Sequence, residues 1–116
     1  MIGERRYLLE SAYHDCLSYE LGELGVGYER SPSISFMYKK LQVARAFRPD
    51  LIVENSVIVE LKSVERLLPI HDAQVQTYLK LTGLIKGLIF NFNTTFLKDG
   101  IRRIDRNAVA PNQKSP

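Results

Sequence analysis

Two apolar runs separated by a short polar step constrain this chain more than any other feature of its sequence. The runs are Leu51-Ile52-Val53 and Val57-Ile58-Val59, which are the most β-prone segments of the chain, because branched aliphatic side chains favour strands. Asn55 and Ser56 lie between them and favour a turn. The segment therefore predicts a β-hairpin.

Three charged residues stand in or beside this apolar hairpin: Asp50, Glu60 and Lys62. Glu60 and Lys62 are two residues apart in a predicted strand, so their side chains point to the same face. Carboxylates on such a face can bind Mg²⁺, and a lysine beside them can orient the attacking water or stabilise a charged transition state. These three residue types alone recur by chance in about 20% of chains this long, so a solvated charged face is the alternative interpretation.

The register of the hairpin decides whether the two carboxylates can share one metal ion. A two-residue turn at Asn55-Ser56 would pair Asp50 with Leu61. The carboxylates of Asp50 and Glu60 would then lie on opposite faces of the sheet. We therefore predict a three-residue loop, Glu54–Ser56, or a bulge before the first strand, with Asp50 opposite Glu60. The backbone carbonyl of Leu61 is then a further candidate ligand.

The composition indicates one ordinary globular domain. The chain has 116 residues, is 45% hydrophobic and 25% charged, and has a net charge of +3, which permits a polyanionic partner without requiring one. No apolar run approaches the ~20 residues of a membrane span. No apolar core follows the basic residues at the N-terminus, so we do not expect a secretory signal. Cys16 is the single cysteine and allows no internal disulfide. Both observations lead us to expect a cytoplasmic protein. We expect the domain to cover residues 1–105, followed by a flexible tail over 106–116.

Two helices are expected to flank the hairpin. Residues from about 4 to 25 carry apolar side chains at three- and four-residue spacing, which predicts an amphipathic helix with Cys16 as a small apolar filler. Glu10 lies beside that apolar stripe, where it either points toward the sheet or borders solvent. Pro69 and Gly83 mark the start and the stop of a second helix.

Further strands are predicted on both sides of the hairpin. Residues 34–38 alternate between apolar and polar, and a strand from about Ala46 leads into the hairpin. Residues 87–92 form a buried-type apolar run, and residues 101–105 are expected to form a short edge strand. The fold class is therefore α/β, with a mixed sheet of four to five strands in the order αβββαβ(β).

Polar residues on the second predicted helix are candidate site residues. Gln74 and Tyr78 are four residues apart and lie on one face. An amide among apolar helix positions needs partners if it is buried, which favours a role for Gln74. Tyr78 either stacks on a base or holds Lys62, or it packs in the core with its hydroxyl bonded at the rim. His71 either contacts phosphate or positions Gln74, or it caps or packs at the helix start. Asn91 at a strand end is either a site residue or structural.

Basic residues cluster near the last predicted strand. Lys98, Arg102 and Arg103 can follow a phosphate backbone, although solvated charge is the default interpretation of such a cluster. Lys39 and Lys40, in a predicted turn, are weaker candidates on the same grounds.

The order of these residues resembles the PD-(D/E)xK nuclease superfamily. Pro49-Asp50, Glu60-x-Lys62 and Gln74-x-x-x-Tyr78 follow one another in the order helix, three strands, helix, strand. Over residues 8–104 the chain is also similar to the small bacterial GxxExxR proteins, grouped in that superfamily as PDDEXK_3. The blocks that carry this similarity include Leu8-Leu9-Glu10-Ser11-x-Tyr13, His71-x-Ala73-Gln74, Tyr78-Leu79-x-Leu81-Thr82-Gly83 and Gly87-Leu88-x-x-Asn91-Phe92. The Gly-x-x-Glu-x-x-Arg signature itself is absent and relatives usually begin with a further helix, so we expect an N-terminally shortened member.

The resemblance implies a restriction-endonuclease-like fold and hydrolysis of nucleic-acid phosphodiester bonds, in DNA rather than RNA, with Mg²⁺ or Mn²⁺. It assigns Asp50, Glu60 and the Leu61 carbonyl to the metal, Lys62 to catalysis, and Gln74, Tyr78 and Glu10 to supporting positions. Two alternatives remain open. One is an inactive nuclease-fold module that binds nucleic acid or protein, and the other is a homodimer formed through an apolar surface.

Overall fold

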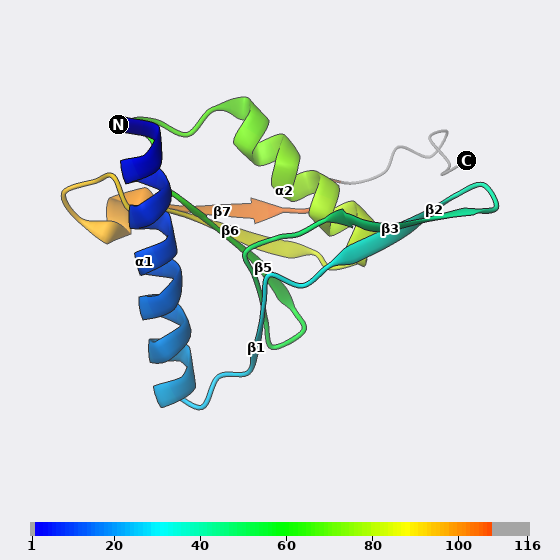
Figure 1. Ribbon diagram of the computed structural model, residues 1–116, viewed down its shortest axis with the longest axis horizontal. Helices are drawn as coiled ribbons and strands as arrows, with labels where there is room; N and C mark the ends of the chain where they lie inside the picture. The colour runs from blue at the N-terminus through cyan, green and yellow to red at the C-terminus, as the bar shows by residue number, and fades with distance from the viewer. Residues whose placement is uncertain (1, 108–116) are drawn as a thin grey trace.

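The computed structural model describes residues 2–107, except the side chains of residues 2–9, 44–46 and 97. In chain order, its elements are α1 (Ile2–Glu23), β1 (Tyr28–Arg30), β2 (Ile34–Tyr38), β3 (Leu41–Phe47), β4 (Leu51–Val53), β5 (Val57–Lys62), α2 (Pro69–Thr82), β6 (Lys86–Asn91), the 3-10 turn η1 (Leu97–Gly100) and β7 (Ile101–Asp105). Five strands form one mixed sheet in the order β1-β4-β5-β6-β7, and β2 pairs with β3 in a separate two-stranded sheet (Figure 1).

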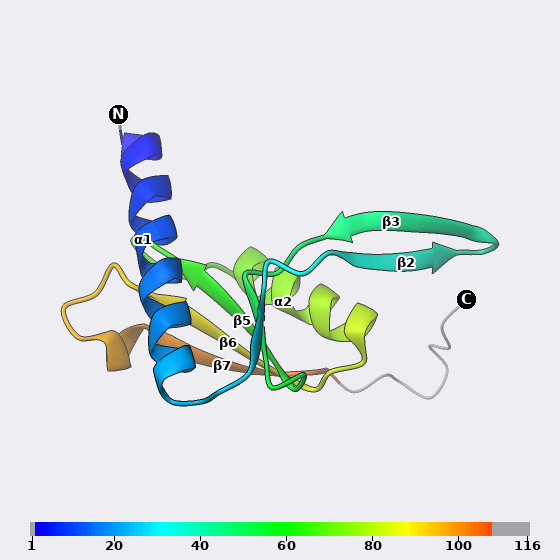
Figure 2. The ribbon, with the colours of Figure 1, turned by 60° about the horizontal axis from the view of Figure 1, so that its bottom comes forward.

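The central strand β5 explains why helices cover both faces of the sheet. Ile58 packs in a core with α2, whereas Val59 and Leu61 pack in a second core with α1. Because successive strand side chains point to opposite faces, a continuous apolar run buries both faces at once. Figures 1 and 2 show α1 and α2 on opposite sides of the sheet.

The register predicted for the hairpin is confirmed. In β4 and β5, Leu51 pairs with Val59 and Val53 pairs with Val57, which leaves a three-residue loop between the strands. Two of the loop residues, Glu54 and Asn55, have φ values of 53° and 52°. Continuing the register by one residue places Asp50 opposite Glu60.

The second half of the sheet follows the expected pattern. Helix α2 connects β5 to β6, which pair in parallel, and β7 is the antiparallel edge strand. The helix begins at Pro69 and ends before Gly83, whose φ of 77° is the left-handed conformation of a C-cap. Within residues 2–107, no helix is long and apolar enough to cross a membrane.

The first half of the structure differs from the prediction in three strands. The sheet contains β1, which pairs with β4 and was not predicted. Strands β2 and β3 stay outside that sheet, and the strand expected from about Ala46 begins earlier, at Leu41, and ends at Phe47. Pro49 lies between β3 and β4, where the strand is broken because proline cannot donate a ladder hydrogen bond.

Two further expectations concern helix α1 and the C-terminal tail. Cys16 is exposed, so its prediction as a buried filler of the α1 stripe is wrong. The stripe turns Leu17 and Leu21 toward the sheet instead. At the other end, the backbone N–H of Arg106 donates to Ile85 and that of Asn107 to the Gln76 side chain. Residues 108–116, most of the predicted tail, lie outside the described residues.

Candidate active site

Asp50 and Glu60 face each other across the β4–β5 hairpin. The backbone N–H of Asp50 donates to Glu60 Oε1 at 2.8 Å, and the backbone N–H of Leu61 donates to Asp50 Oδ2 at 2.7 Å. Each carboxylate is therefore oriented by a backbone group beside the other. This exchange depends on the three-residue loop, because a shift by one residue would separate the two side chains.

Glu60 is a buried acid, with 4% of its surface exposed. Burial, and then the charge of Asp50, raise the pKa of Glu60 to about 7, although the Asp50 N–H and Lys62 partly oppose this shift. Two carboxylates held this close repel each other when both are ionised. The protein has thus placed negative charge where a cation would stabilise it.

Lys62 is held beside Glu60 by α2. Its Nζ lies 3.7 Å from Glu60 Oε2 and donates to Gln74 Oε1 at 3.1 Å. The Gln74 Nε2 in turn donates to the Tyr78 hydroxyl at 3.3 Å. Tyr78 is 5% exposed and its ring belongs to the α2 core. Tyr78 thus packs in the core with its hydroxyl bonded to Gln74, which confirms the core alternative predicted for it.

The Leu61 carbonyl points to the same side of β5 as Asp50. The carbonyl of the next residue, Lys62, accepts from the Phe92 N–H at 2.9 Å, which turns it toward β6. Neighbouring carbonyls of a strand point in opposite directions, so the Leu61 carbonyl points away from β6, like its own N–H.

The donors fit a hard cation. Among the side chains that the structure describes, no three His, Cys, Asp or Glu residues are grouped as a metal site. A metal here would be held by Asp50, Glu60, the Leu61 carbonyl and water. Oxygen donors with positions left for water are what Mg²⁺ prefers in proteins.

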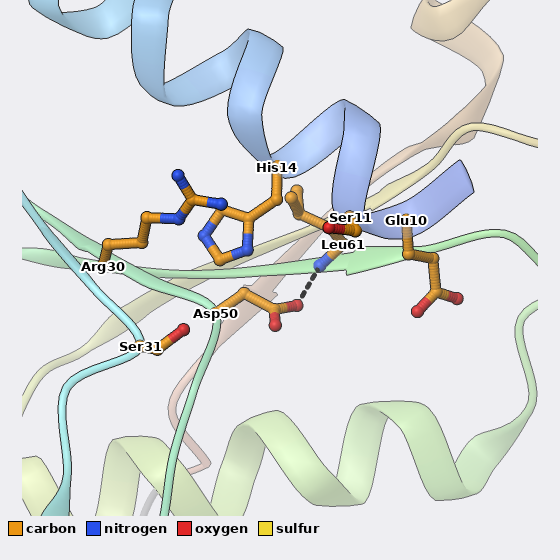
Figure 3. Close-up of a pocket in the computed structure, with 7 residues that line it drawn as sticks. All are labelled: Glu10, Ser11, His14, Arg30, Ser31, Asp50 and Leu61. Carbon is orange, nitrogen blue, oxygen red and sulfur yellow. Dashed lines mark hydrogen bonds between the residues drawn. The ribbon is translucent and has the colours of Figure 1, made fainter. Parts of the chain in front are cut away.

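A pocket of about 290 Å³ opens next to these residues, between α1 and the edge of the hairpin. Its lining residues are Glu10, Ser11 and His14 from α1, Arg30 at the end of β1, Ser31 directly after it, and Asp50 and Leu61 (Figure 3). Glu10 Oε1 accepts from the Ser63 N–H at 3.0 Å, just beyond the end of β5. Of the two predictions for Glu10, the one in which it points toward the sheet is therefore confirmed.

Sequence reasoning missed the other pocket residues on α1 and at the end of β1. His14 lies one turn after Glu10, so the helical spacing could have identified it. Burial, and then the Arg30 guanidinium, lower the pKa of His14. Its Nε2 is buried and has no hydrogen-bond partner among the described residues. Arg30 and Ser31 carried no local signal, because only the pairing of β1 with β4 brings them here.

His71 and Asn91 have structural roles. His71 Nδ1 accepts from the Leu68 N–H at 2.9 Å, so this histidine caps α2. Asn91 bonds both the N–H and the carbonyl of Val64, at 3.1 and 2.9 Å. Of the alternatives given for these two residues, the structural ones are confirmed.

The predicted basic cluster does not lie at the carboxylates. Arg102 pairs with Asp72 at 2.6 Å, and Arg103 with Asp105 at 3.2 Å. Both are on β7, and β6 separates β7 from β5 in the sheet. Lys98 is in η1, where its Nζ lies 6.0 Å from the Phe96 ring. Acids thus already neutralise the two arginines.

Comparison with known proteins identifies the family of this chain. The sequence matches the PDDEXK_3 family of the PD-(D/E)XK nuclease superfamily over residues 4–104. The chain belongs to this nuclease superfamily. The expected membership is thus confirmed, and PD-(D/E)XK nucleases generally use divalent metal ions. Among curated protein sequences, none matches the chain.

Solved structures share the nuclease fold. The crystal structure of SSO0001 has a TM-score of 0.64 and 20% identity, and the match covers 89% of this chain and 52% of that one. An alkaline exonuclease from Laribacter hongkongensis has a TM-score of 0.62 and 18% identity, covering 90% of this chain and 58% of its own. Its complex with dAMP gives a TM-score of 0.61 with 18% identity, covering 90% of this chain and 57% of that one. This nuclease domain thus spans little more than half the length of these neighbours.

Proposed function

We propose that this chain is a nuclease that hydrolyses phosphodiester bonds of DNA with Mg²⁺ or Mn²⁺. The observation that carries the proposal is the convergence of Asp50, Glu60 and Lys62 on one end of the β4–β5 hairpin. Glu60 and Lys62 are largely buried, yet polar groups of the hairpin and of Gln74 hold them in place. A fold that needed only packing would have no use for this arrangement.

Each residue has a role that follows from its contacts. Asp50, Glu60 and the Leu61 carbonyl would hold the metal, which when bound polarises the phosphate and activates water. Lys62, positioned by Gln74, stabilises the negative charge that develops on the phosphate oxygens. Glu10 fixes α1 against the end of β5 and lines the adjoining pocket with its carboxylate.

The experiment is cleavage of single- and double-stranded DNA and RNA by the pure protein with Mg²⁺, Mn²⁺ or EDTA. We expect DNA cleavage that EDTA abolishes, and a loss of about 10²- to 10⁴-fold in Asp50→Ala and Lys62→Ala. Lys80→Ala is the matched control, because Lys80 is an exposed lysine of α2. Turnover that persists in the Asp50 and Lys62 variants would come from a contaminant and would remove the assignment.

The second candidate is a nuclease-fold module that binds nucleic acid without cutting it. Only two side-chain carboxylates face each other across the hairpin, and no group of three ligand side chains is present among the described residues. Binding in EDTA that Glu60→Gln leaves unaffected, together with no cleavage in any metal, would favour this module over the nuclease.

A further inference from the structure

The β2–β3 hairpin projects away from the body of the molecule (Figures 1 and 2). We call residues 32–49 the arm. The residues on either side of the arm are joined, because the Ser31 N–H donates to the Asp50 carbonyl at 2.7 Å. Ser31 and Asp50 both line the pocket of the candidate active site. The arm therefore leaves the body and returns to it at that pocket.

The charge of the arm is one-sided. Residues 32–49 contain Lys39, Lys40, Arg45 and Arg48 and no acid, which gives the arm a net charge of +4. The whole chain has a net charge of +3, so the remaining residues together carry −1. The positive charge of this protein is thus concentrated in one projecting hairpin. A concentrated positive patch attracts polyanions.

Apolar and aromatic side chains are exposed where the two strands turn. Met37, Tyr38 and Leu41 are 60%, 60% and 62% exposed. The Lys39 Nζ lies 5.7 Å from the centre of the Tyr38 ring. Among the described side chains, no acid pairs with Lys39 or Lys40. Free lysines beside an exposed ring are the combination that binds single-stranded nucleic acid, by phosphate contacts and by stacking.

The root of the arm is packed, unlike its tip. The Phe47 ring lies 6.1 Å from Phe36 and 6.0 Å from Tyr78, and Ile34 packs on the same α2 core. Tyr78 is bonded to Gln74, which holds Lys62. A two-stranded hairpin is marginally stable alone, so this packing is what holds the arm beside the site.

We propose that the arm binds a single-stranded stretch of the nucleic-acid substrate beside the cleavage site, with Lys39 and Lys40 on phosphates and Tyr38 stacked on a base. This inference rests on the proposed function, because the arm starts at the pocket of the proposed nuclease. Nucleic acid fits the tip better than a second copy of the chain does. Two arms of charge +4 repel each other, whereas a phosphate backbone complements that charge.

The test measures binding of a fluorescein-labelled single-stranded DNA by anisotropy, in EDTA and at several salt concentrations. For Lys39→Ala/Lys40→Ala we expect affinity to fall about tenfold, and the slope of log K against log salt to become shallower by about 1.4, since each lost phosphate contact removes about 0.7. The matched control is Lys80→Ala/Lys86→Ala, which removes the same charge from exposed positions of α2 and β6. Its salt slope should equal that of the unmodified protein.

The stacking step has its own pair of variants. Tyr38→Ala should weaken binding by about fivefold or more, because it removes one base–ring stack. Tyr38→Phe keeps the ring and should bind like the unmodified protein. Tyr38 is exposed, and circular dichroism checks that each of the two variants is folded. Equal binding by Tyr38→Ala and Tyr38→Phe would overturn the stacking role.

The outcomes separate the arm from the nuclease. Binding that depends on the arm, without cleavage, would support the proposed role of the arm and end the nuclease proposal. Cleavage by the protein, with arm variants that bind DNA normally, would overturn the proposed role of the arm and leave the nuclease proposal standing. An equal loss of DNA affinity in the control variant, or no binding by any form of the protein, would also overturn the proposed role of the arm. A dimer in sedimentation that Leu41→Ser dissociates, with DNA binding unchanged, would show self-association instead.

Discussion

The two β-hairpins of this chain use the same local structure in opposite environments. The β4–β5 hairpin lies inside the sheet, with helices packed on both faces, and its charged residues are held by hydrogen bonds. The β2–β3 hairpin forms a separate two-stranded sheet, packs on the α2 core at its root, and exposes its lysines at the turn. Both turns contain a residue other than glycine at positive φ, Glu54 at 53° and Lys39 at 54°.

This difference shows what burial does to charge. Glu60, at 4% exposure, lies near Asp50 and has a raised pKa, so its protonation state depends on a few fixed partners. Exposed charges such as Lys40 are surrounded by water and contribute to a long-range field that salt screens. The first arrangement suits chemistry at one atom, and the second suits capture of an extended anion.

The largest effect that should separate the hairpins is on catalysis. Lys62→Ala should lower kcat by about 10²- to 10⁴-fold, because the proposed role of Lys62 is to stabilise charge that develops in the transition state. Lys40→Ala should act mainly on KM, since the proposed contact of Lys40 with the substrate backbone is the same in the ground and transition states. Steady-state kinetics on single-stranded DNA measures both constants. Losses of the same kind in the two variants would contradict the division of roles.

A smaller difference is expected in stability. Ile58→Ala should lower the free energy of unfolding by about 2–5 kcal/mol, because Ile58 is fully buried in the sheet. Leu41→Ala should change it by less than about 0.5 kcal/mol, since Leu41 is 62% exposed at the arm. Urea unfolding measures both. A large loss in Leu41→Ala would mean that the arm packs against something in solution.

The smallest difference concerns the two turns. Lys39→Gly and Glu54→Gly both replace a side chain at positive φ, so both relieve a similar strain. Glu54 Oε1 also accepts from the Gly27 N–H at 3.0 Å, and Glu54→Gly removes that bond. Lys39→Gly should therefore be more stable than Glu54→Gly by about 1 kcal/mol. Equal thermal midpoints would show that the Gly27 contact contributes nothing.

The elements that the sequence predicted correctly share one property, which is that local chemistry decides them. Pro69 and Gly83 delimit α2 because a proline fits a first helical turn and a glycine fits a left-handed cap. The register of Asp50 and Glu60 followed from the two-residue period of a strand and the loop length. Lys62 and Gln74 could be named as candidate site residues for the same reason, since one lies on a regular strand and the other on a regular helix.

The errors lie where pairing partners are distant in the chain. Strand β1 is only three residues long and joins the sheet through β4, more than 20 residues later. Cys16 belongs to a helical stripe that the sheet covers only in part, so spacing alone could not show that it is exposed. The nucleic-acid role of the basic cluster near β7 stays a prediction, and the structure adds that its two arginines have acidic partners, Asp72 and Asp105.

The sequence by itself determined the nuclease-type hairpin, the helix that follows it, and which residues could hold a metal or stabilise charge. These depend on side-chain period and turn chemistry, which act between near neighbours. Only the tertiary structure decided that Glu10 reaches the end of β5 across 53 residues, that Arg30 enters the pocket, and that the arm stands beside it. Such contacts depend on how whole faces of helices and sheets bury their apolar surface together, and no local pattern encodes that choice.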